Sequence, residues 1–391
     1  SITSSLSQSM LHGPKIRLGK GEVNEMQQGL TDFAGPDVPS SKGSRGLHCL
    51  DSATPIGQTR RKGLTWRQSR SRGSIMSISA FTFPGQGSQS VGMGKDLAHE
   101  FPEARAVFHE VDEALGERLS SIMFEGPEDI LRLTENAQPA LMAVSMAVIR
   151  VLEARGVSLK DHAKYVAGHS LGEYSALCAA GTFSLADAAR LLRTRGQAMQ
   201  KAVPVGHGAM AALLGLDLET AQAVADEAAR GEVCAVANDN APGQVVVSGA
   251  TAAIERAVDI AKGKGAKRAL LLPVSAPFHC SLMQPAAEAM AAALAEVEMK
   301  APVVPLVANV LAAPISDPDD IRQRLVEQVT GVVRWTESVT WLTTAGGVAN
   351  LVELGSGKVL TGLAKRIAAD ASAQAVGTPA DVDAFVAQLG A

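Results

Sequence analysis

The sequence predicts an α/β fold with a mainly parallel sheet, on three observations. From Met76 onward, short apolar runs alternate with segments of helical period, as expected for helices that cover a parallel sheet. A strand-like run at 165–167 leads through the turn 168–172 into a helix-like run at 173–180. Residues 206–275 show a different order of elements, β-α-β-β-α-β, which is the ferredoxin-like arrangement.

The core is predicted from two separate parts of the chain. Residues 76–83 alternate apolar and polar side chains like a first strand, and residues 141–152 are apolar on most sides, like a buried helix. An amphipathic helix is predicted over 185–203, ending before Pro204. The apolar runs resume after residue 275, so we expect one α/β core formed by residues 76–205 and 276–391.

The unit inserted between these parts is predicted element by element. Strands are expected at 209–215, 233–238, 244–248 and 267–274, with helices at 218–230 and 251–264. Residues 239–243 read Asp-Asn-Ala-Pro-Gly, a composition typical of a turn. We therefore expect residues 206–275 to form a ferredoxin-like subdomain of their own.

Residues 1–75 differ from the rest of the chain. They are rich in Ser, Gly and Arg and show no sustained period of 3.6 or 2. They lack the amphipathic pattern of a transit peptide and the apolar segment of a signal peptide. We expect an extension that is disordered or non-native, with Met76 as the natural start.

Composition narrows the classes of function. The net charge is −4, and because residues 1–75 are basic the rest of the chain is distinctly acidic, which argues against nucleic acid as a partner. No apolar run reaches the length expected of a membrane helix. The four cysteines are widely spaced, which predicts neither a disulfide framework nor a metal site and favours the cytoplasm.

Ser170 is the candidate nucleophile. It is the serine of Gly168-His169-Ser170-Leu171-Gly172, a G-x-S-x-G pentapeptide between a predicted strand and a predicted helix. Such a turn exposes the hydroxyl, and the helix N-terminus offers unpaired N–H groups to an oxyanion. A glycine-rich structural turn is the alternative, since a pattern this short also arises by chance.

A serine nucleophile needs a base and an oxyanion hole. His279 follows the strand predicted at 267–274 and can face the serine from a neighbouring strand end. His169 should point away from the hydroxyl at the turn, and the other histidines lie in the N-terminal extension, in charged segments or in a hinge loop. A loop histidine without a role is the alternative. The backbone N–H of Leu171, next to the serine, and that of Gln86, between two glycines, are the candidate oxyanion donors.

Six motifs in order carry a resemblance that covers residues 76–391. They are Phe-Pro-Gly-Gln-Gly-Ser-Gln at 83–89, Gly-His-Ser-Leu-Gly-Glu-Tyr-Ser-Ala at 168–176, Arg-Gly-Gln-Ala-Met-Gln at 195–200, Asn-Asp-Asn-Ala-Pro-Gly-Gln at 238–244, Pro-Phe-His at 277–279 and Gly-Lys-Val-Leu-Thr-Gly-Leu at 357–363. Together they resemble the malonyl-CoA:acyl carrier protein transacylase family. That resemblance implies a hydrolase-like α/β core with a ferredoxin-like insertion.

The resemblance also implies roles for single residues. Ser170 would be acylated, His279 would act as its general base, and Gln86 and Leu171 would form the oxyanion hole. Arg195 would bind the free carboxylate of the malonyl group, which suits the two-pronged guanidinium. Gln328 would lie beside His279 and help to orient it. No carboxylate partner for His279 stands out, and the resemblance implies that a backbone carbonyl holds the imidazole.

The function implied is ping-pong transfer of malonyl from malonyl-CoA to the phosphopantetheine thiol of acyl carrier protein, in fatty acid biosynthesis. We expect a monomer with no permanently bound cofactor. Three alternatives stay open: an acyltransferase of polyketide assembly, a serine thioesterase or hydrolase, and a non-catalytic carrier-binding module. Because carrier proteins are acidic, basic residues are the candidate docking surface: Lys262, Lys264, Lys267, Arg268, Arg190 and Arg193.

Overall fold

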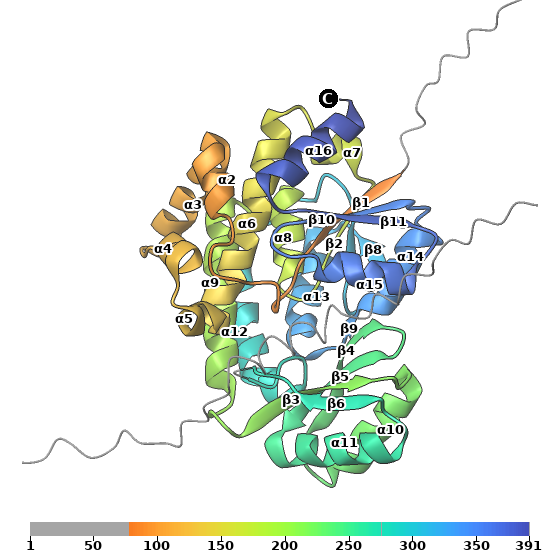
Figure 1. Cartoon of the computed structure of the whole chain (residues 1–391). Coiled ribbons are helices and arrows are strands. Elements are labelled where there is room, and N and C mark those ends of the chain that lie inside the picture. The colour runs from red at the N-terminus through yellow and green to blue at the C-terminus, as the bar shows by residue number, and fades with distance from the viewer. Residues whose placement is uncertain (1–77, 275, 391) are drawn as a thin grey trace, which may run out of the picture. The chain divides into compact units, whose positions relative to one another are not determined.

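The computed structural model describes residues 78–274 and 276–390, so the extension predicted for residues 1–75 lies outside the described part. Within the described residues the chain forms two sheets, of six and five strands, surrounded by helices (Figure 1). The α/β class predicted from the sequence is confirmed.

The larger sheet has the strand order β11-β10-β1-β2-β7-β8. Its strands are β1 (Ser79–Phe83), β2 (Tyr165–Gly168), β7 (Leu306–Ala308), β8 (Ala313–Ile315), β10 (Asn350–Leu354) and β11 (Ser372–Val376). Neighbouring strands from β11 to β7 are parallel, whereas β8 pairs antiparallel with β7. Strands from both ends of the described chain therefore meet at the centre, where β1 lies between β10 and β2.

Side chains of the central strands alternate between two hydrophobic clusters, one on each face of the sheet. Phe81 and Phe83 enter the cluster that contains helices α6 (Thr134–Ala154) and α8 (Gly172–Ala179). Ala80 enters the opposite cluster, with α14 (Trp335–Thr343) and α15 (Val359–Ile367). Because strand side chains alternate with a period of two, these apolar runs are covered on both faces, as in other parallel sheets.

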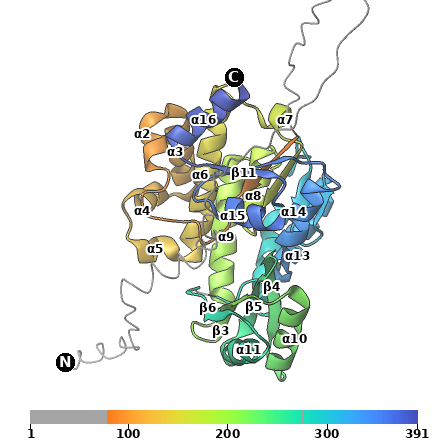
Figure 2. The ribbon, with the colours of Figure 1, turned by 45° about the vertical axis from the view of Figure 1, so that its right-hand side comes forward.

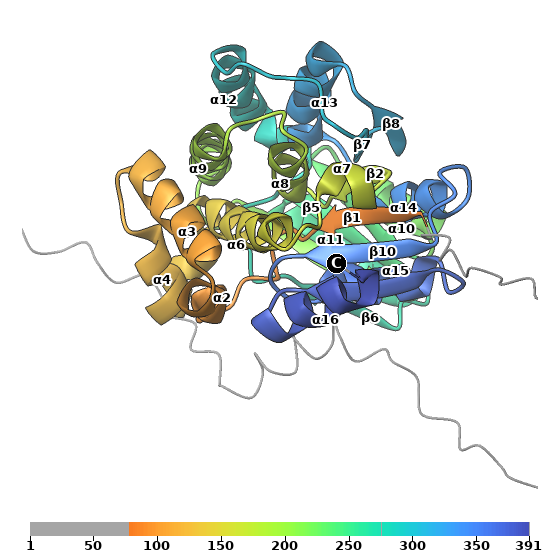
Figure 3. The same ribbon diagram turned by 90° about the horizontal axis from the view of Figure 1, so that it is seen from above.

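The remaining helices enclose this core or link its parts. They are α2 (Lys95–Glu100), α3 (Pro102–Leu115), α4 (Leu119–Glu125), α5 (Glu128–Arg132), α7 (Leu159–His162), α9 (Leu185–Ala202), α12 (Gln284–Ala295), α13 (Pro318–Thr330), α16 (Pro379–Leu389) and the 3₁₀ turn η1 (Ser281–Met283). Helix α9 packs on α6, and α12 packs on α9 and α13; Figure 3 shows this neighbourhood from above.

Helix α6 corrects one expectation from the sequence. It begins seven residues before the predicted segment 141–152, and among the described residues it is long and apolar enough to cross a membrane by length and composition. However, 83% of its most apolar window is buried inside the protein. The helix therefore has the properties of a core helix, which passes the same test as a membrane span.

Helix α9 carries a buried stripe at helical spacing. Ser184 caps its N-terminus by accepting a hydrogen bond from the backbone N–H of Asp187. The buried positions recur every three or four residues: Leu185, Ala188, Leu192, Arg195 and Met199. Arg195 thus occupies a position in the pattern where an apolar residue is usual, and the fold buries its side chain.

The smaller sheet has the order β6-β3-β5-β4-β9. Its elements are β3 (Gly208–Leu214), α10 (Leu218–Ala229), β4 (Cys234–Ala241), β5 (Gln244–Ala250), α11 (Thr251–Gly263), β6 (Arg268–Leu271) and β9 (Val333–Arg334). Strands β3 to β6 pair antiparallel, and β9 joins β4 in parallel from a later part of the chain. Helices α10 and α11 pack against each other and against this sheet (Figure 2).

Two predicted boundaries in this unit are wrong. Strand β4 continues to Ala241, through most of the segment predicted as a turn, because Asn238 and Asp239 pair with β9 and the register shifts on β5 absorb the irregularity. Strand β6 ends at Leu271, three residues early. His279 consequently lies in a loop before η1 rather than directly after a strand.

Candidate active site

Ser170 lies at the sharp turn between β2 and α8. Its φ of 54° is in the left-handed region, which a non-glycine residue adopts only when its surroundings impose it. Asn309, directly after β7, accepts a hydrogen bond from the Ser170 N–H at 2.8 Å, and its side-chain N–H donates to the carbonyl of Gly168 at 2.7 Å. One side chain therefore fixes both sides of the turn.

The two glycines of the pentapeptide are required by close backbone contacts. A Cβ on Gly168 would lie 1.9 Å from the carbonyl carbon of Gly172. A Cβ on Gly172 would lie 2.3 Å from the carbonyl oxygen of Phe83 at the end of β1. Neither obstacle is a flexible side chain, so the G-x-S-x-G spacing reflects the packing of the turn against β1.

His279 faces Ser170 as predicted. The Ser170 hydroxyl and the Nε2 atom of His279 are 2.8 Å apart, and the Nδ1 atom lies 2.9 Å from the backbone carbonyl of Gln328 on α13. Because a carbonyl can only accept, Nδ1 carries the proton and Nε2 is left to accept the proton of the serine hydroxyl. The φ of His279, 58°, is also left-handed.

Burial keeps this imidazole neutral. Removal from water, and next the nearby charge of Arg195, lower the pKa of His279 to about 3. Of the other described histidines, His169 turns away from the serine and donates from Nε2 to Asn240 at 2.8 Å, and His162 contacts the Ser158 carbonyl through Nδ1 at 2.9 Å. His99, His109 and His207 are exposed. Geometry and protonation state both favour His279 as the partner of Ser170.

Arg195 reaches the same point from α9 and is 1% exposed. Its Nη2 donates to the Ser170 hydroxyl at 3.2 Å and to the side-chain oxygen of Gln328 at 2.7 Å, and Nη1 donates to Gln138 at 2.8 Å. Its Nε is buried without a hydrogen-bond partner in the described structure. No carboxylate of the described residues forms an ion pair with this guanidinium, so a buried positive charge faces the serine.

The loop after β1 brings Gln86 to the site through side chains of α6. The Gln86 side-chain oxygen accepts from the Thr134 hydroxyl at 2.8 Å, and Thr134 accepts from Gln138 at 2.9 Å. Across residues 78–274 and 276–390, the backbone N–H groups of Gln86 and Leu171 donate to no described acceptor. Both donors therefore stay available to a ligand at Ser170.

Glu173, in the first turn of α8, completes a buried polar network. It is 1% exposed, and its carboxylate accepts from the Asn309 N–H at 2.6 Å and from the side-chain amide of Gln328. Burial raises the pKa of Glu173 to about 8, against the lowering effect of Asn309, Gln328 and Arg195. Within the described range, no three His, Cys, Asp or Glu side chains cluster closely enough to hold a metal ion.

Comparison with known proteins places this site in a family. Residues 80–387 match the acyl transferase domain. Over 315 residues the chain is 45% identical to the malonyl CoA-acyl carrier protein transacylase of Bacillus subtilis (strain 168), covering 80% of this chain and 98% of that protein. The chain belongs to the malonyl CoA-acyl carrier protein transacylase family.

Solved structures similar to this member of the transacylase family share its fold. An acyl-carrier-protein-S-malonyltransferase from Bartonella henselae is 60% identical with a TM-score of 0.79, covering 80% of this chain and all of that one. A malonyl-transacylase solved in complex with a type II PKS acyl-carrier protein is 45% identical with a TM-score of 0.77, at the same coverages. The resemblance inferred from the six motifs is confirmed.

The resemblance to the transacylase family pointed to six site residues but not to the residues that support them. The structure brings Ser170, His279, Arg195 and Gln328 within hydrogen-bonding distance of one another. The predictions missed three buried polar residues: Gln138, Glu173 and Asn309. Glu173 directly follows the pentapeptide 168–172, and a charged residue in an otherwise apolar helix could have indicated its role. Nothing in the sequence around Asn309 or Gln138 indicates that they belong to the site.

In the turn that holds Ser170, Gly172→Ala is expected to abolish acylation of the serine and to lower the melting temperature of the protein markedly. The reason is that the added Cβ would meet the backbone of Phe83. Thermal melting and acyl-enzyme formation measure the two effects. Gly263→Ala at the end of α11 is the matched control, since its Cβ would meet nothing within 4 Å. Equal melting temperatures for the two variants would contradict the packing explanation.

Proposed function

We propose that this chain transfers the malonyl group of malonyl-CoA to the phosphopantetheine thiol of acyl carrier protein, in fatty acid biosynthesis, through a malonyl ester of Ser170. The observation that carries the proposal is the buried Arg195, which lies 3.2 Å from the Ser170 hydroxyl and has no carboxylate partner among the described residues. A malonyl group on Ser170 would supply that carboxylate. The names of the relatives, which are transacylases for malonyl CoA and acyl carrier protein, support the same substrates.

In the first step of this proposal, His279 accepts the Ser170 proton at Nε2 while the serine oxygen attacks the thioester carbonyl. The backbone N–H groups of Gln86 and Leu171 stabilise the tetrahedral oxyanion. As the intermediate collapses, the carbon–sulfur bond breaks and His279 returns the proton to the CoA thiolate. Arg195 holds the malonyl carboxylate throughout, so that Ser170 is acylated by malonyl in preference to acetyl.

The second step reverses the first with another thiol. His279 takes the proton of the phosphopantetheine thiol, the sulfur attacks the malonyl ester, and the proton returns to Ser170. A backbone carbonyl is a sufficient partner for the imidazole in both steps, because a thioester is an activated acyl donor. His279 Nδ1 meets the Gln328 carbonyl and no carboxylate of the described residues, which favours acyl exchange over hydrolysis.

The fold and setting belong to the same proposal. Residues 76–205 and 276–391 form a hydrolase-like acyltransferase core, and residues 206–275 form a ferredoxin-like subdomain. The antiparallel order β6-β3-β5-β4 supports the second assignment, with β9 as an added strand. The enzyme acts as a monomer in the cytoplasm and needs no bound cofactor.

A polyketide acyltransferase is the second candidate, and one observation favours it. A relative that is 45% identical was solved with a type II PKS acyl-carrier protein. The chemistry at Ser170 would be the same and the carrier would differ. Comparing kcat/KM for a fatty acid carrier and for a polyketide carrier separates the two, and we expect the fatty acid carrier to be the better substrate.

The experiment that tests the proposed function separates its two half-reactions. The enzyme is incubated with malonyl-CoA, freed of all CoA by gel filtration, and then mixed with phosphopantetheinylated carrier protein. The proposal predicts that the malonyl group moves to the carrier in the absence of CoA. Transfer only when malonyl-CoA and carrier are present together would contradict it, and release of free malonate instead would indicate a hydrolase.

Two of the candidate docking residues stand apart from the others. Lys262, Lys264, Arg190 and Arg193 each pair with a nearby carboxylate, those of Asp259, Glu227, Asp187 and Glu117. Lys267 and Arg268 are exposed and form no ion pair with the described residues. They lie at the start of β6, an edge strand whose Leu270 and Leu271 are 40% and 48% exposed.

Charge reversal of Lys267 and Arg268 to glutamate is therefore expected to raise the KM for carrier protein several-fold and to leave the KM for malonyl-CoA unchanged. The physical reason is the loss of attraction for an acidic partner, which salt should also weaken. Steady-state kinetics against each substrate measure the effect. Lys160→Glu on α7 is the control, and an unchanged carrier KM in the double variant would refute this docking surface.

A further inference from the structure

Glu173 is a buried carboxylate that the mechanism above does not use. It lies within the hydrogen-bonded network behind Ser170, in the first turn of α8, and forms no described hydrogen bond to the serine hydroxyl. Its two oxygens accept from two different elements: the backbone N–H of Asn309 after β7 and the side-chain amide of Gln328 on α13. Both partners in turn contact the nucleophile's own backbone.

Gln328 connects Glu173 to both functional side chains. Its amide N–H groups point to Glu173 and to the carbonyl of Ser170 at 2.9 Å, which leaves its amide oxygen for Arg195 at 2.7 Å. Its backbone carbonyl accepts from His279 at 2.9 Å. A side-chain amide can rotate and exchange its oxygen and nitrogen, so some other group must fix which end faces Arg195. The Glu173 carboxyl group fixes it, because its two oxygens accept from the Asn309 N–H and from the Gln328 amide nitrogen.

We propose that Glu173 is a positioning residue, whose carboxyl group holds the Gln328 side-chain amide with its oxygen toward Arg195. The inference rests on the proposed function, because it explains how that site keeps Arg195 oriented for a carboxylated acyl group.

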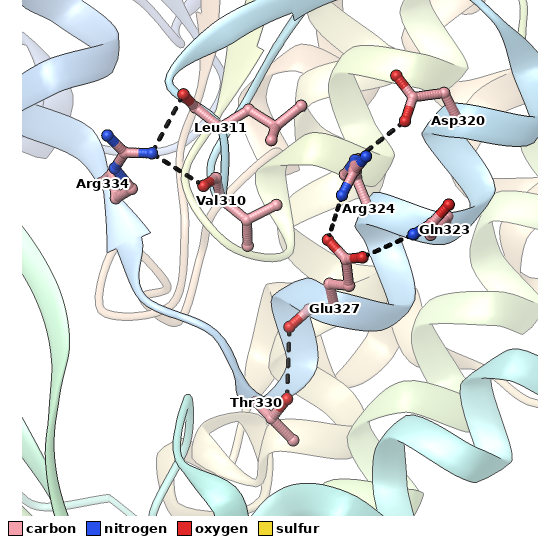
Figure 4. A network of polar contacts seen from close by, with 8 residues as sticks. All are labelled: Val310, Leu311, Asp320, Gln323, Arg324, Glu327, Thr330 and Arg334. Atoms are coloured by element: carbon pink, nitrogen blue, oxygen red, sulfur yellow. Dashed lines mark hydrogen bonds and ion pairs between the residues drawn. The ribbon is translucent and has the colours of Figure 1, made fainter.

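Helix α13 and the loop after β7 are fixed independently on their outer side. Arg324 lies between Asp320 and Glu327, and the Arg334 guanidinium donates to the carbonyls of Val310 and Leu311 (Figure 4). The Arg334 N–H also donates to the Asn309 carbonyl at 3.1 Å. The Arg324 ion pairs lie within α13, and the Arg334 contacts hold the loop after β7; neither set involves Glu173, so replacing Glu173 should disturb the Gln328 side chain more than the fold.

The test compares acylation of Ser170 by malonyl-CoA and by acetyl-CoA, read as the ratio of the two initial rates. Assays run at about pH 8.5, above the pKa of about 8 to which burial raises Glu173. In Glu173→Gln the new side-chain N–H must face either the Asn309 N–H or the Gln328 amide nitrogen, both of which are donors. We therefore expect the malonyl-to-acetyl ratio to fall at least about tenfold. Glu327→Gln removes a carboxylate from the outer face of the same helix as Gln328 and should keep the wild-type ratio.

A double variant, Glu173→Gln with Gln328→Glu, separates positioning from stability. The new amide at position 173 can donate to the new carboxylate at position 328. That carboxylate also lies against Arg195, where it competes with the carboxylate of malonyl. The proposal predicts that the melting temperature recovers while the malonyl-to-acetyl ratio stays low. This variant also carries the test if Glu173→Gln does not fold.

Two results would overturn the inference. One is a folded Glu173→Gln enzyme whose malonyl-to-acetyl ratio equals that of the wild type. The other is a Glu173→Gln enzyme that loses both acylation rates equally, when the double variant restores both rates in full, including the malonyl rate. The wild type distinguishes this failure from failure of the proposed function, since a wild-type chain that forms no malonyl adduct contradicts the function itself.

Discussion

His279→Ala is expected to slow acylation of Ser170 by about a hundred- to ten-thousandfold, the usual contribution of a positioned general base. The hydroxyl of Ser170 would lose the acceptor 2.8 Å away, and no other described histidine faces it. Rapid mixing with malonyl-CoA followed by mass analysis measures the rate. His109→Ala on the exposed side of α3 is the control and should acylate at the wild-type rate.

The pH profile gives an independent check on this base. Burial and the charge of Arg195 lower the pKa of His279 to about 3, so the imidazole is already neutral well below its ordinary pKa. A base must be neutral to accept a proton, and acylation should therefore stay nearly constant as the pH falls from about 7.5 to about 5. A loss of rate with a midpoint near the ordinary histidine value would contradict the buried, neutral assignment.

Arg195→Ala is expected to lower acylation by malonyl-CoA by about two to three orders of magnitude, as removal of one partner of a buried charge pair usually does. Acetyl-CoA presents no carboxylate, so its acylation should fall far less, and the enzyme should shift toward acetyl. The measurement is a competition between the two thioesters, with each adduct separated by mass. Retained preference for malonyl would show that another group recognises the carboxylate.

Arg190→Ala is the matched control for this variant. Arg190 lies on the same helix, α9, but its side chain is exposed and paired with Asp187. Its loss should leave the preference for malonyl unchanged. Arg195→Lys adds a second comparison, because lysine keeps the charge but not the two-pronged geometry, and we expect it to recover part of the malonyl rate.

The turn around Ser170 could be predicted because its chemistry is local. Two glycines and a serine between a strand and a helix specify a tight turn wherever they occur, and the contacts of Gly168 and Gly172 explain the spacing. The amphipathic period of α9 could also be predicted, although the sequence alone does not show that Arg195 lies on the buried side of the helix. The motifs supplied that residue through resemblance.

The supporting network could not be predicted, because its members are distant in the sequence. Asn309 reaches Ser170 across 139 positions, and Gln138 reaches Arg195 across 57. Such contacts depend on the order of strands β1, β2 and β7 in the sheet, which local periodicity does not specify. The turn predicted at 239–243 failed for the same reason, since pairing with the distant strand β9 extends β4.

The mass of the intact protein after brief incubation with malonyl-CoA shows directly whether Ser170 is acylated. We expect one malonyl adduct, mapped by proteolysis to Ser170, and no adduct on Ser170→Ala under the same conditions. An adduct that persists in Ser170→Ala, or one that maps to another residue, would contradict the assignment of Ser170 as the acylated nucleophile.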